Sequence, residues 1–92
     1  MPYWVYILRC SDDSYYTGHT DDLENRIAQH QDGSIEGYTH PRRPVELVWS
    51  AEFPTRLEAL ERERQIKGWR RAKKEALIQG DWERLQDLSR GM

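Results

Sequence analysis

One acidic side chain of this sequence lies among apolar residues, where a charge needs an explanation. If residues 55–67 form a helix, then at about 100° per residue Glu63 projects between Leu60 on one side and Ile66 on the other. A carboxylate inside an apolar stripe is costly unless a partner neutralises it. Three explanations are open: Glu63 binds a metal ion, it lines an open cleft, or it forms a structural ion pair with a cation such as Arg26.

A basic pair lies in the first third of the chain. Arg26 and His30 are four residues apart, so in a helix they share one side. The planar guanidinium of Arg26 can donate two hydrogen bonds to one phosphate. The same pattern is also typical of a solvated helix flank, and His30 could equally cap the last helical carbonyls as a cation.

Two tyrosines fall in consecutive predicted strands. Tyr6 belongs to an aromatic and β-branched run at residues 3–10, and Tyr16 belongs to the returning run at residues 15–17. Phenols on a hairpin usually serve packing, and their facing depends on a register that the sequence leaves open. Cys10 has no histidine near it in the sequence that would make it a nucleophile, so we interpret it as a buried apolar residue.

Basic residues gather in one segment of the chain. Residues 62–74 carry seven basic residues and one acidic residue, with an aromatic ring among them. Cations interleaved with aromatic rings can hold phosphates and stack bases, although a charge run is more often a solvated face. The candidates for nucleic-acid contact are Arg42, Arg43, Lys67, Trp69, Arg70, Arg71, Lys73 and Lys74.

Hydrophobic periodicity and capping signals predict the elements that must hold these side chains. We expect strands at residues 3–10, 15–17 and 45–49, and helices at residues 21–31, 55–67 and 71–79, with a further short helix allowed from Asp81. The order β-β-α-β-α-α predicts an α+β fold, with a small three-stranded, mainly antiparallel sheet flanked by helices. Residues 1–80 would form the domain, and residues 81–92 a short helix and tail packed on it.

Composition restricts the classes of protein that fit. The chain has 92 residues, of which 33% are charged and 37% hydrophobic, and its net charge is −2. Its longest apolar run, residues 3–8, is far shorter than the roughly 20 residues of a membrane span, and we find no secretory leader. One cysteine allows neither an internal disulfide nor a multi-cysteine zinc site. We therefore expect one small cytoplasmic domain that does not contact a membrane.

Taken together, these residues resemble the pattern of the GIY-YIG nucleases. The segments 4–6 (Trp-Val-Tyr) and 16–18 (Tyr-Thr-Gly) resemble the two halves of the family signature, with other residues where the family has Gly and Ile in the first half and Ile in the second. Arg26, in Leu-Glu-Asn-Arg-Ile, resembles the catalytic arginine, and residues 58–67 look like the metal-binding glutamate motif with Glu63 at the ligand position. Residues 39–44 and 69–78 also match, so nearly the whole chain resembles the small stand-alone bacterial members.

The resemblance implies hydrolysis of a DNA phosphodiester with one divalent ion, Mg²⁺ or else Mn²⁺. It implies Glu63 as the metal ligand and Arg26 as the donor to the phosphate oxygens. Either Tyr6 or Tyr16 would orient or deprotonate the attacking water. His30 would relay the proton or contact a phosphate. A last position that matches, Gly18, would form a structural turn after the second strand.

Two other functions are compatible with the same sequence. A module that binds DNA or RNA without cutting it would use the same cleft and basic residues, and its binding would need neither metal nor Glu63. A protein-interaction domain would instead expose an apolar patch on the last helix, where Trp82, Leu85 and Leu88 share one side. A chain this short has little area for reading bases, so we expect contacts to the backbone or recognition of an unusual shape. The oligomeric state is left open.

Overall fold

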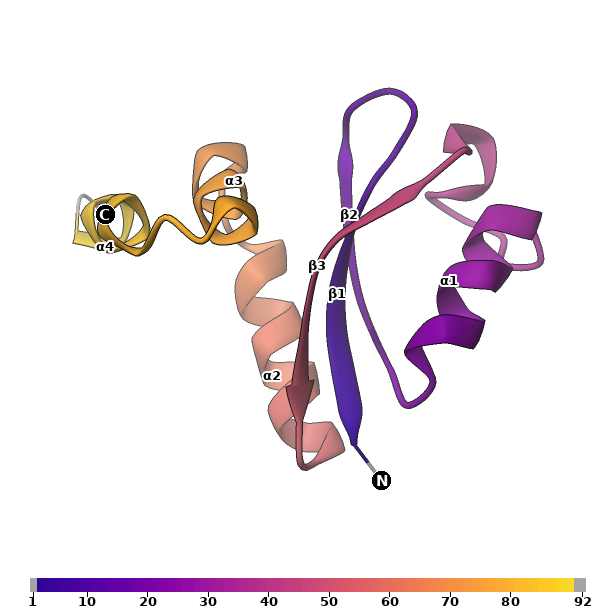
Figure 1. Ribbon diagram of the computed structural model, residues 1–92, viewed down its shortest axis with the longest axis horizontal. Helices are drawn as coiled ribbons and strands as arrows, with labels where there is room; N and C mark the ends of the chain where they lie inside the picture. The colour runs from indigo at the N-terminus through magenta and orange to yellow at the C-terminus, as the bar shows by residue number, and fades with distance from the viewer. Residues whose placement is uncertain (1, 91–92) are drawn as a thin grey trace.

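A three-stranded antiparallel sheet forms the middle layer of the computed structural model, which describes residues 2–90 (Figure 1). The strand order is β2-β1-β3. The elements in chain order are β1 (Tyr3–Arg9), β2 (Tyr15–Thr20), α1 (Leu23–Asp32), the short 3-10 helix η1 (His40–Arg42), β3 (Glu46–Phe53), α2 (Arg56–Lys67), α3 (Arg71–Gln79) and α4 (Trp82–Arg90). The predicted α+β class, sheet and element order are confirmed, and the final helix is present.

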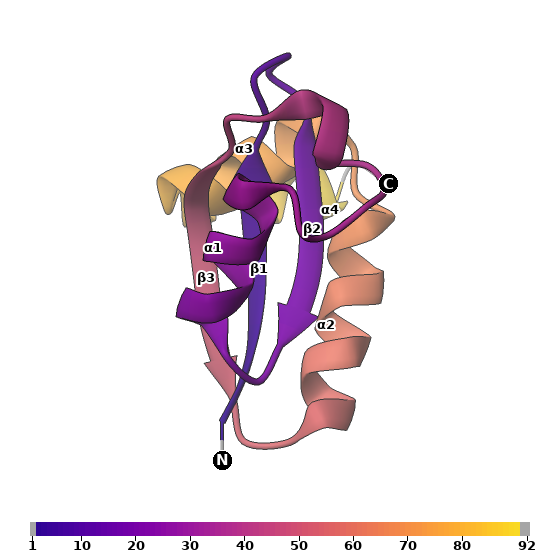
Figure 2. The same ribbon diagram turned by 90° about the vertical axis from the view of Figure 1, so that its right-hand side faces the viewer.

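Helices cover both faces of the sheet. Helix α1 lies on one face, whereas α2 and α3 lie on the other, with α4 outside α3 (Figure 1). Turned by 90°, the molecule shows α1 in front of the sheet and α2 running along its β2 edge (Figure 2). Within residues 2–90 no helix is long and apolar enough to cross a membrane. The predicted tail at residues 91–92 lies outside the described residues.

The central strand β1 divides the apolar interior into two clusters. Val5 and Ile7 face α2 and pack with Ala59, whereas Tyr6 and Leu8 face α1. These four β1 residues are at most 2% exposed, because a neighbouring strand lies on each side and helices cover both faces. A strand buried on both faces explains the unbroken apolar run of the sequence.

Both outer strands are longer than the sequence predicts. Strand β2 continues to Thr20 and β3 continues to Phe53, because pairing with β1 extends along their whole length. Gly18 therefore lies inside β2, opposite Tyr6, and the expectation that it forms a turn is wrong. Glycine weakens an isolated strand, but here the pairing with β1 determines its conformation.

The helix ends follow the capping signals with small shifts. Asp22 caps α1 by accepting a hydrogen bond from the Asn25 amide, so the helix begins slightly later than predicted. Thr55 caps α2, as its spacing to Glu58 predicts, by accepting from that residue's amide at 3.2 Å. Leu57 in the first turn of this helix is 63% exposed, since it precedes the part of α2 that meets the sheet.

Helix α4 packs on α3 and adds one side chain to the interior. Leu85 packs against the cluster under α2, whereas Trp82 is 59% exposed and Leu88 is half-buried. The predicted boundary at residue 80 falls at Gly80, whose left-handed conformation ends α3. The three apolar residues of α4 therefore do not form one continuous exposed patch.

Candidate functional site

A buried hydrogen-bonded chain joins β1, α1 and the following loop. The hydroxyl of Tyr6 lies 2.9 Å from Nε2 of His30, and Nδ1 of the same imidazole lies 2.8 Å from the hydroxyl of Thr39. All three residues are at most 2% exposed. A neutral imidazole has one N–H and one lone pair, so it donates to one hydroxyl and accepts from the other.

Burial keeps the two titratable groups of this chain, Tyr6 and His30, uncharged. It lowers the pKa of His30, and the charge of Arg26 lowers it further, so the imidazole is neutral at pH 7. Burial also raises the pKa of Tyr6, as do Tyr16 and the charge of Glu63, whereas Arg26 lowers it. The charges of Arg26 from α1 and of Glu63 from α2 therefore act on the same phenol.

Gly18 is the place where the two phenols meet. A Cβ atom at this position would lie 2.6 Å from the Tyr6 hydroxyl and 3.2 Å from a ring carbon of Tyr16, closer than side chains pack. The Tyr16 ring also lies 5.2 Å from the His30 ring and stacks on Tyr38 at 6.1 Å between centroids. Glycine is required here because its missing side chain leaves room for both rings over β2.

The acidic part of the site comes from α2. Glu63 is 7% exposed and forms ion pairs with His19 of β2, at 2.5 Å, and with Lys67 one helical turn later, at 2.8 Å. Burial by itself would raise the pKa of Glu63, but hydrogen bonds to Lys67 and His19 outweigh it and hold the pKa below its usual value. Glu63 is therefore a charged carboxylate at the edge strand, and its ion pairs within residues 2–90 do not include Arg26.

A cleft lies next to both parts of the site, because one of its lining residues, Arg26, acts on Tyr6 and His30, and another, His19, contacts Glu63. It has a volume of about 250 Å³ and is lined by Arg26 of α1, His19 of β2 and Arg56 of α2, together with Tyr3 and Asp21. Strand β2 places Gly18 under the phenols on one face and His19 beside Glu63 on the other. Because β2 is the outer strand, groups from both faces of the sheet come together at its edge.

The free carboxylate positions of Glu63 suit one divalent metal ion that keeps most of its bound water molecules. Among residues 2–90 no group of three His, Cys, Asp or Glu side chains could hold a metal. Glu63 has about four lone-pair positions and uses two of them for His19 and Lys67, so two are left. Mg²⁺ commonly binds through one or two carboxylates plus substrate phosphates, and Mn²⁺ accepts the same ligands.

The residues predicted to contact nucleic acid lie in several places. Lys67 belongs to the Glu63 group. Arg42 pairs with Asp12 at 3.1 Å and stacks on Tyr38 at 4.0 Å, on the α1 side. Arg43 donates to a backbone carbonyl at 2.9 Å and covers Gly33.

The rest of this set belongs to the start of α3 and the segment before it. Arg71 lies over the Tyr15 ring at 4.4 Å and donates to a carbonyl of the hairpin turn, so it braces the hairpin. Burial lowers the pKa of Lys74, and the charge of Arg71 lowers it further. Arg70 is exposed and precedes the helix. Trp69 and Lys73 contact each other and line a separate pocket.

Three residues of the site escaped the sequence reasoning. His19 was placed after the end of a strand, although the strand continues and directs it to Glu63. Thr39 lies in a loop nine residues from His30, and no local pattern marks their contact. Arg56 follows the Thr55 cap and looks like an ordinary first-turn residue. Cys10, by contrast, is 3% exposed and packs in the α1-side cluster, so its prediction as a buried apolar residue is confirmed.

Comparison with known proteins places this geometry in a family. The family model described as the GIY-YIG catalytic domain matches residues 2–76. The chain is 47% identical over 76 residues to a UPF0213 protein of Staphylococcus saprophyticus, which covers 83% of this chain and 93% of that protein. It is 45% identical over 76 residues to a UPF0213 protein of Natronomonas pharaonis, covering 83% and 89% of the two chains.

Solved structures agree with the sequence relatives. The solution structure of a UPF0213 protein from Bacillus halodurans is 41% identical, with a TM-score of 0.57 and coverage of 97% of this chain and 98% of that one. A second solution structure, of a protein from E. faecalis, is 34% identical with a TM-score of 0.61, covering 87% of this chain and 85% of that one. The resemblance seen in the sequence is thereby confirmed: this chain belongs to the GIY-YIG family, among its small single-domain UPF0213 members.

Proposed function

We propose that this protein is an endonuclease that hydrolyses phosphodiester bonds of DNA at the β2 edge. The observation that carries the proposal is that Arg26, His19 and Arg56 line one cleft, beside the ion-paired Glu63. Guanidinium groups suit phosphate oxygens, and a charged carboxylate suits a divalent ion. Membership of a family described by its catalytic domain supports a nuclease over other phosphate-binding proteins.

Tyr16 is the phenol that we assign to the attacking water. Tyr6 is 2% exposed and its hydroxyl is bonded to His30, so it has no access to a substrate. Tyr16 is only half-buried, and within residues 2–90 its hydroxyl makes no hydrogen bond. Tyr16 would accept a hydrogen bond from the water and orient it towards phosphorus, while Tyr6 and His30 hold the aromatic cluster in place.

The charged groups stabilise the phosphate as negative charge develops on it. Arg26 donates to the non-bridging oxygens, with Arg56 beside it in the cleft. Glu63 would hold the divalent ion, Mg²⁺ or Mn²⁺, which when bound supplies charge that activates water and stabilises the departing 3′ oxygen. Lys67 balances the carboxylate of Glu63 in the free protein, and His19 fixes its orientation from the strand.

The test is nicking of supercoiled plasmid in Mg²⁺ or Mn²⁺. Glu63→Gln and Arg26→Ala should each lower the rate by about a hundredfold or more, because each removes charge that stabilises the transition state. Glu61→Gln is the matched control, since it makes the same change at an exposed position of α2 and should leave the rate unchanged. Full activity of Glu63→Gln, or of the unmodified protein in excess EDTA, would refute the proposal.

A second candidate is a module that binds DNA or RNA without cutting it. The observation that favours it is that both oxygens of Glu63 already have partners in the free protein, one in His19 and the other in Lys67. This function predicts salt-sensitive binding that is equal in EDTA and in Mg²⁺, with no nicked product under any condition. We place either function in the cytoplasm, because the one cysteine is a free, buried thiol, as is usual in a reducing compartment.

A further inference from the structure

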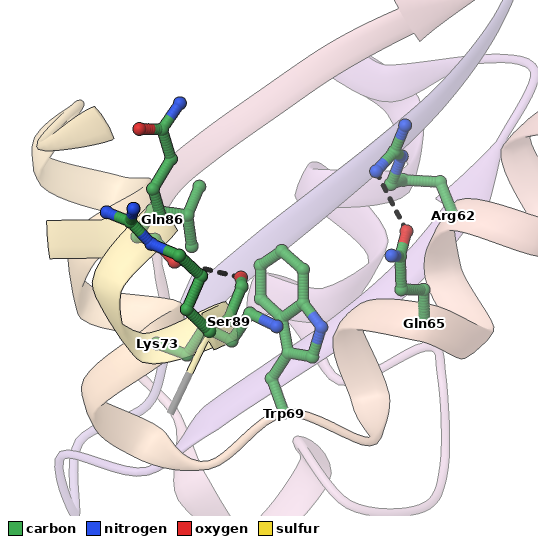
Figure 3. A pocket seen from close by; sticks show the side chains of 8 residues that line it. Arg62, Gln65, Trp69, Lys73, Gln86 and Ser89 are labelled. Atoms are coloured by element: carbon green, nitrogen blue, oxygen red, sulfur yellow. Dashed lines mark hydrogen bonds between the residues drawn. The ribbon is translucent and has the colours of Figure 1, made fainter. Parts of the chain in front are cut away.

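A second pocket, of about 470 Å³, lies where the end of α2, the start of α3 and the last turns of α4 meet (Figure 3). Figure 3 shows Trp69 between Ser89 of α4 on one side and Arg62 and Gln65 of α2 on the other. Glu63 points away from this pocket, to β2. Pockets of this size are typical of sites for small ligands, and this one is separate from the candidate active site.

The pocket is positively charged, although the chain has a net charge of −2. Arg62, Lys73 and Arg90 provide three cations, and none of the residues from 2–90 that line the pocket is acidic. Arg90 pairs with Asp87, but that pair is exposed and water screens it. Lys73 has no ion pair within the described part of the chain, so its ammonium group is available to an anion.

An indole ring forms the apolar wall of the pocket. Trp69 is half-buried and packs against the cluster that includes Ile66 and Leu77. The ammonium of Lys73 lies over this ring, 4.4 Å from its centroid, so in the free protein the lining cation covers one face of the indole, and a stacked base would take its place there. An aromatic face beside cations is the arrangement on which single-stranded nucleic acids stack a base and place a phosphate.

We propose that this pocket binds one unpaired nucleotide of the substrate strand, with its base on Trp69 and its phosphate on Lys73 and Arg90. A base inside a duplex is covered on both faces by its neighbours, so it must leave the stack before it can lie on the indole. At the rim, Gln86 offers an amide to the edge of the base. The hydroxyl of Ser89 donates to a backbone carbonyl at 2.9 Å and is left as an acceptor.

The inference rests on the proposed function in one respect, which is that the substrate is a nucleic acid. A helix is about 10–12 Å across with its side chains, so a few unpaired nucleotides can cross the outer surface of α2 between the two sites. Arg64 is exposed on this helix next to Glu63. The proposal thus narrows the substrate class to DNA with an unpaired strand near the bond that is cut.

Binding in EDTA tests the pocket without cleavage. We would titrate the unmodified protein into a fluorescein-labelled oligothymidylate, and into a blunt duplex of the same length, and follow fluorescence anisotropy. Lys73→Glu and Arg90→Glu should each weaken binding of the single strand by about tenfold. Arg84→Glu, the same change on α4 outside the pocket, should change it by no more than about twofold. Trp69→Leu should weaken it by about 5- to 100-fold through the loss of stacking.

Several results would refute the proposal that this pocket binds an unpaired nucleotide. One is unchanged binding in Lys73→Glu and Arg90→Glu, or an equal loss in Arg84→Glu. Equal affinity for the blunt duplex would exclude a stacked base, and competition by thymidine monophosphate as effective as that of the oligonucleotide would assign the pocket to a free nucleotide. If circular dichroism shows that Trp69→Leu does not fold, the binding measured with Lys73→Glu and Arg90→Glu decides whether the pocket holds the strand.

The nuclease and the pocket can fail separately. If the plasmid is never nicked but Lys73→Glu still loses binding of the oligonucleotide, the pocket stands and the catalytic proposal fails. If the plasmid is nicked in a metal-dependent way but Lys73→Glu binds the oligonucleotide like the unmodified protein, the catalytic proposal stands and the pocket fails.

Discussion

Replacing Gly18 by alanine tests the arrangement of the two phenols directly. The new Cβ would lie 2.6 Å from the Tyr6 hydroxyl and 2.7 Å from the ring carbon that carries it. Comfortable contacts between such atoms are about 3.5 Å, so the ring or the strand must move by about 1 Å. The ring has little freedom to do so, because Tyr6 is 2% exposed and its hydroxyl is bonded to His30 at 2.9 Å.

The cost of Gly18→Ala follows from these contacts. Overpacking a core by one methyl group costs about 1–3 kcal/mol, and losing the hydrogen bond to His30 adds about 1 kcal/mol. The sum, about 2–4 kcal/mol, should lower the melting temperature of a domain of this size by roughly 10–30 °C. The rate of plasmid nicking should fall as well, since the Tyr16 ring packs against the same glycine. Thermal unfolding by circular dichroism and the nicking assay measure the two effects.

Gly68→Ala is the matched control. Gly68 has φ −80°, and the nearest atom to a Cβ there lies at 3.5 Å, which is an ordinary contact. Alanine should leave the stability unchanged or raise it by about 0.4–1 kcal/mol. Removing the ring with Tyr6→Leu in the Gly18→Ala background should recover part of the loss. If the Gly18→Ala protein has the same melting temperature and nicking rate as the unmodified protein, the close packing of Tyr6 and Tyr16 over Gly18 is refuted.

Three further predictions concern the buried chain and the carboxylate. Because burial lowers the pKa of His30 below 6.5, the folded protein binds fewer protons than the unfolded chain just below pH 6.5. The free energy of unfolding should therefore fall as the pH drops through this window, and urea titrations should show a smaller fall in His30→Gln. Thr39→Val leaves Nδ1 of His30 without its partner and should cost about 1–3 kcal/mol in the same urea titrations; a loss below about 0.5 kcal/mol would contradict the buried hydrogen bond. Lys67→Met removes a hydrogen-bond donor from Glu63, so the pKa of Glu63 should rise, as NMR titration of its side-chain carboxyl carbon can measure. Arg64→Met, an exposed change on the same helix, should leave that pKa unmoved, and an equal rise in both variants would argue against the specific pair.

The sequence predicts those parts of the fold that depend on neighbours along the chain. The cap at Thr55 and the burial of Glu63 beside Ile66 both follow from local patterns, and the structure confirms them. The final length of β2 and β3 depends instead on pairing with β1 and is not encoded in either strand alone. Strand propensity therefore predicts that β2 ends at Gly18, whereas pairing with β1 extends the strand to Thr20.

The candidate site likewise contains some residues that a local pattern reveals and others that only the tertiary fold brings together. Glu63 stands out because a charge among apolar residues is visible in one helix. The chain from Tyr6 through His30 to Thr39 joins three separate segments, and nothing near any one of them indicates the other two. Cations are equally hard to interpret from sequence, because Arg71 looks like a phosphate ligand and in the structure braces the hairpin.

Because β1 divides the interior into two clusters, amino-acid substitutions should be tolerated differently on its two sides. On the α1 side, the packed core includes Tyr6 and Tyr16 of the site, and Tyr6 is hydrogen-bonded to the buried His30, so stability and chemistry depend in part on the same atoms. On the α2 side, Ala59, Ile66 and Leu77 only fill space and could be exchanged for other aliphatic residues of similar total volume. We therefore expect substitutions to accumulate on the α2 side wherever they do not touch Glu63, Lys67 or His19, and to be rarer around Tyr6 and His30 on the α1 side.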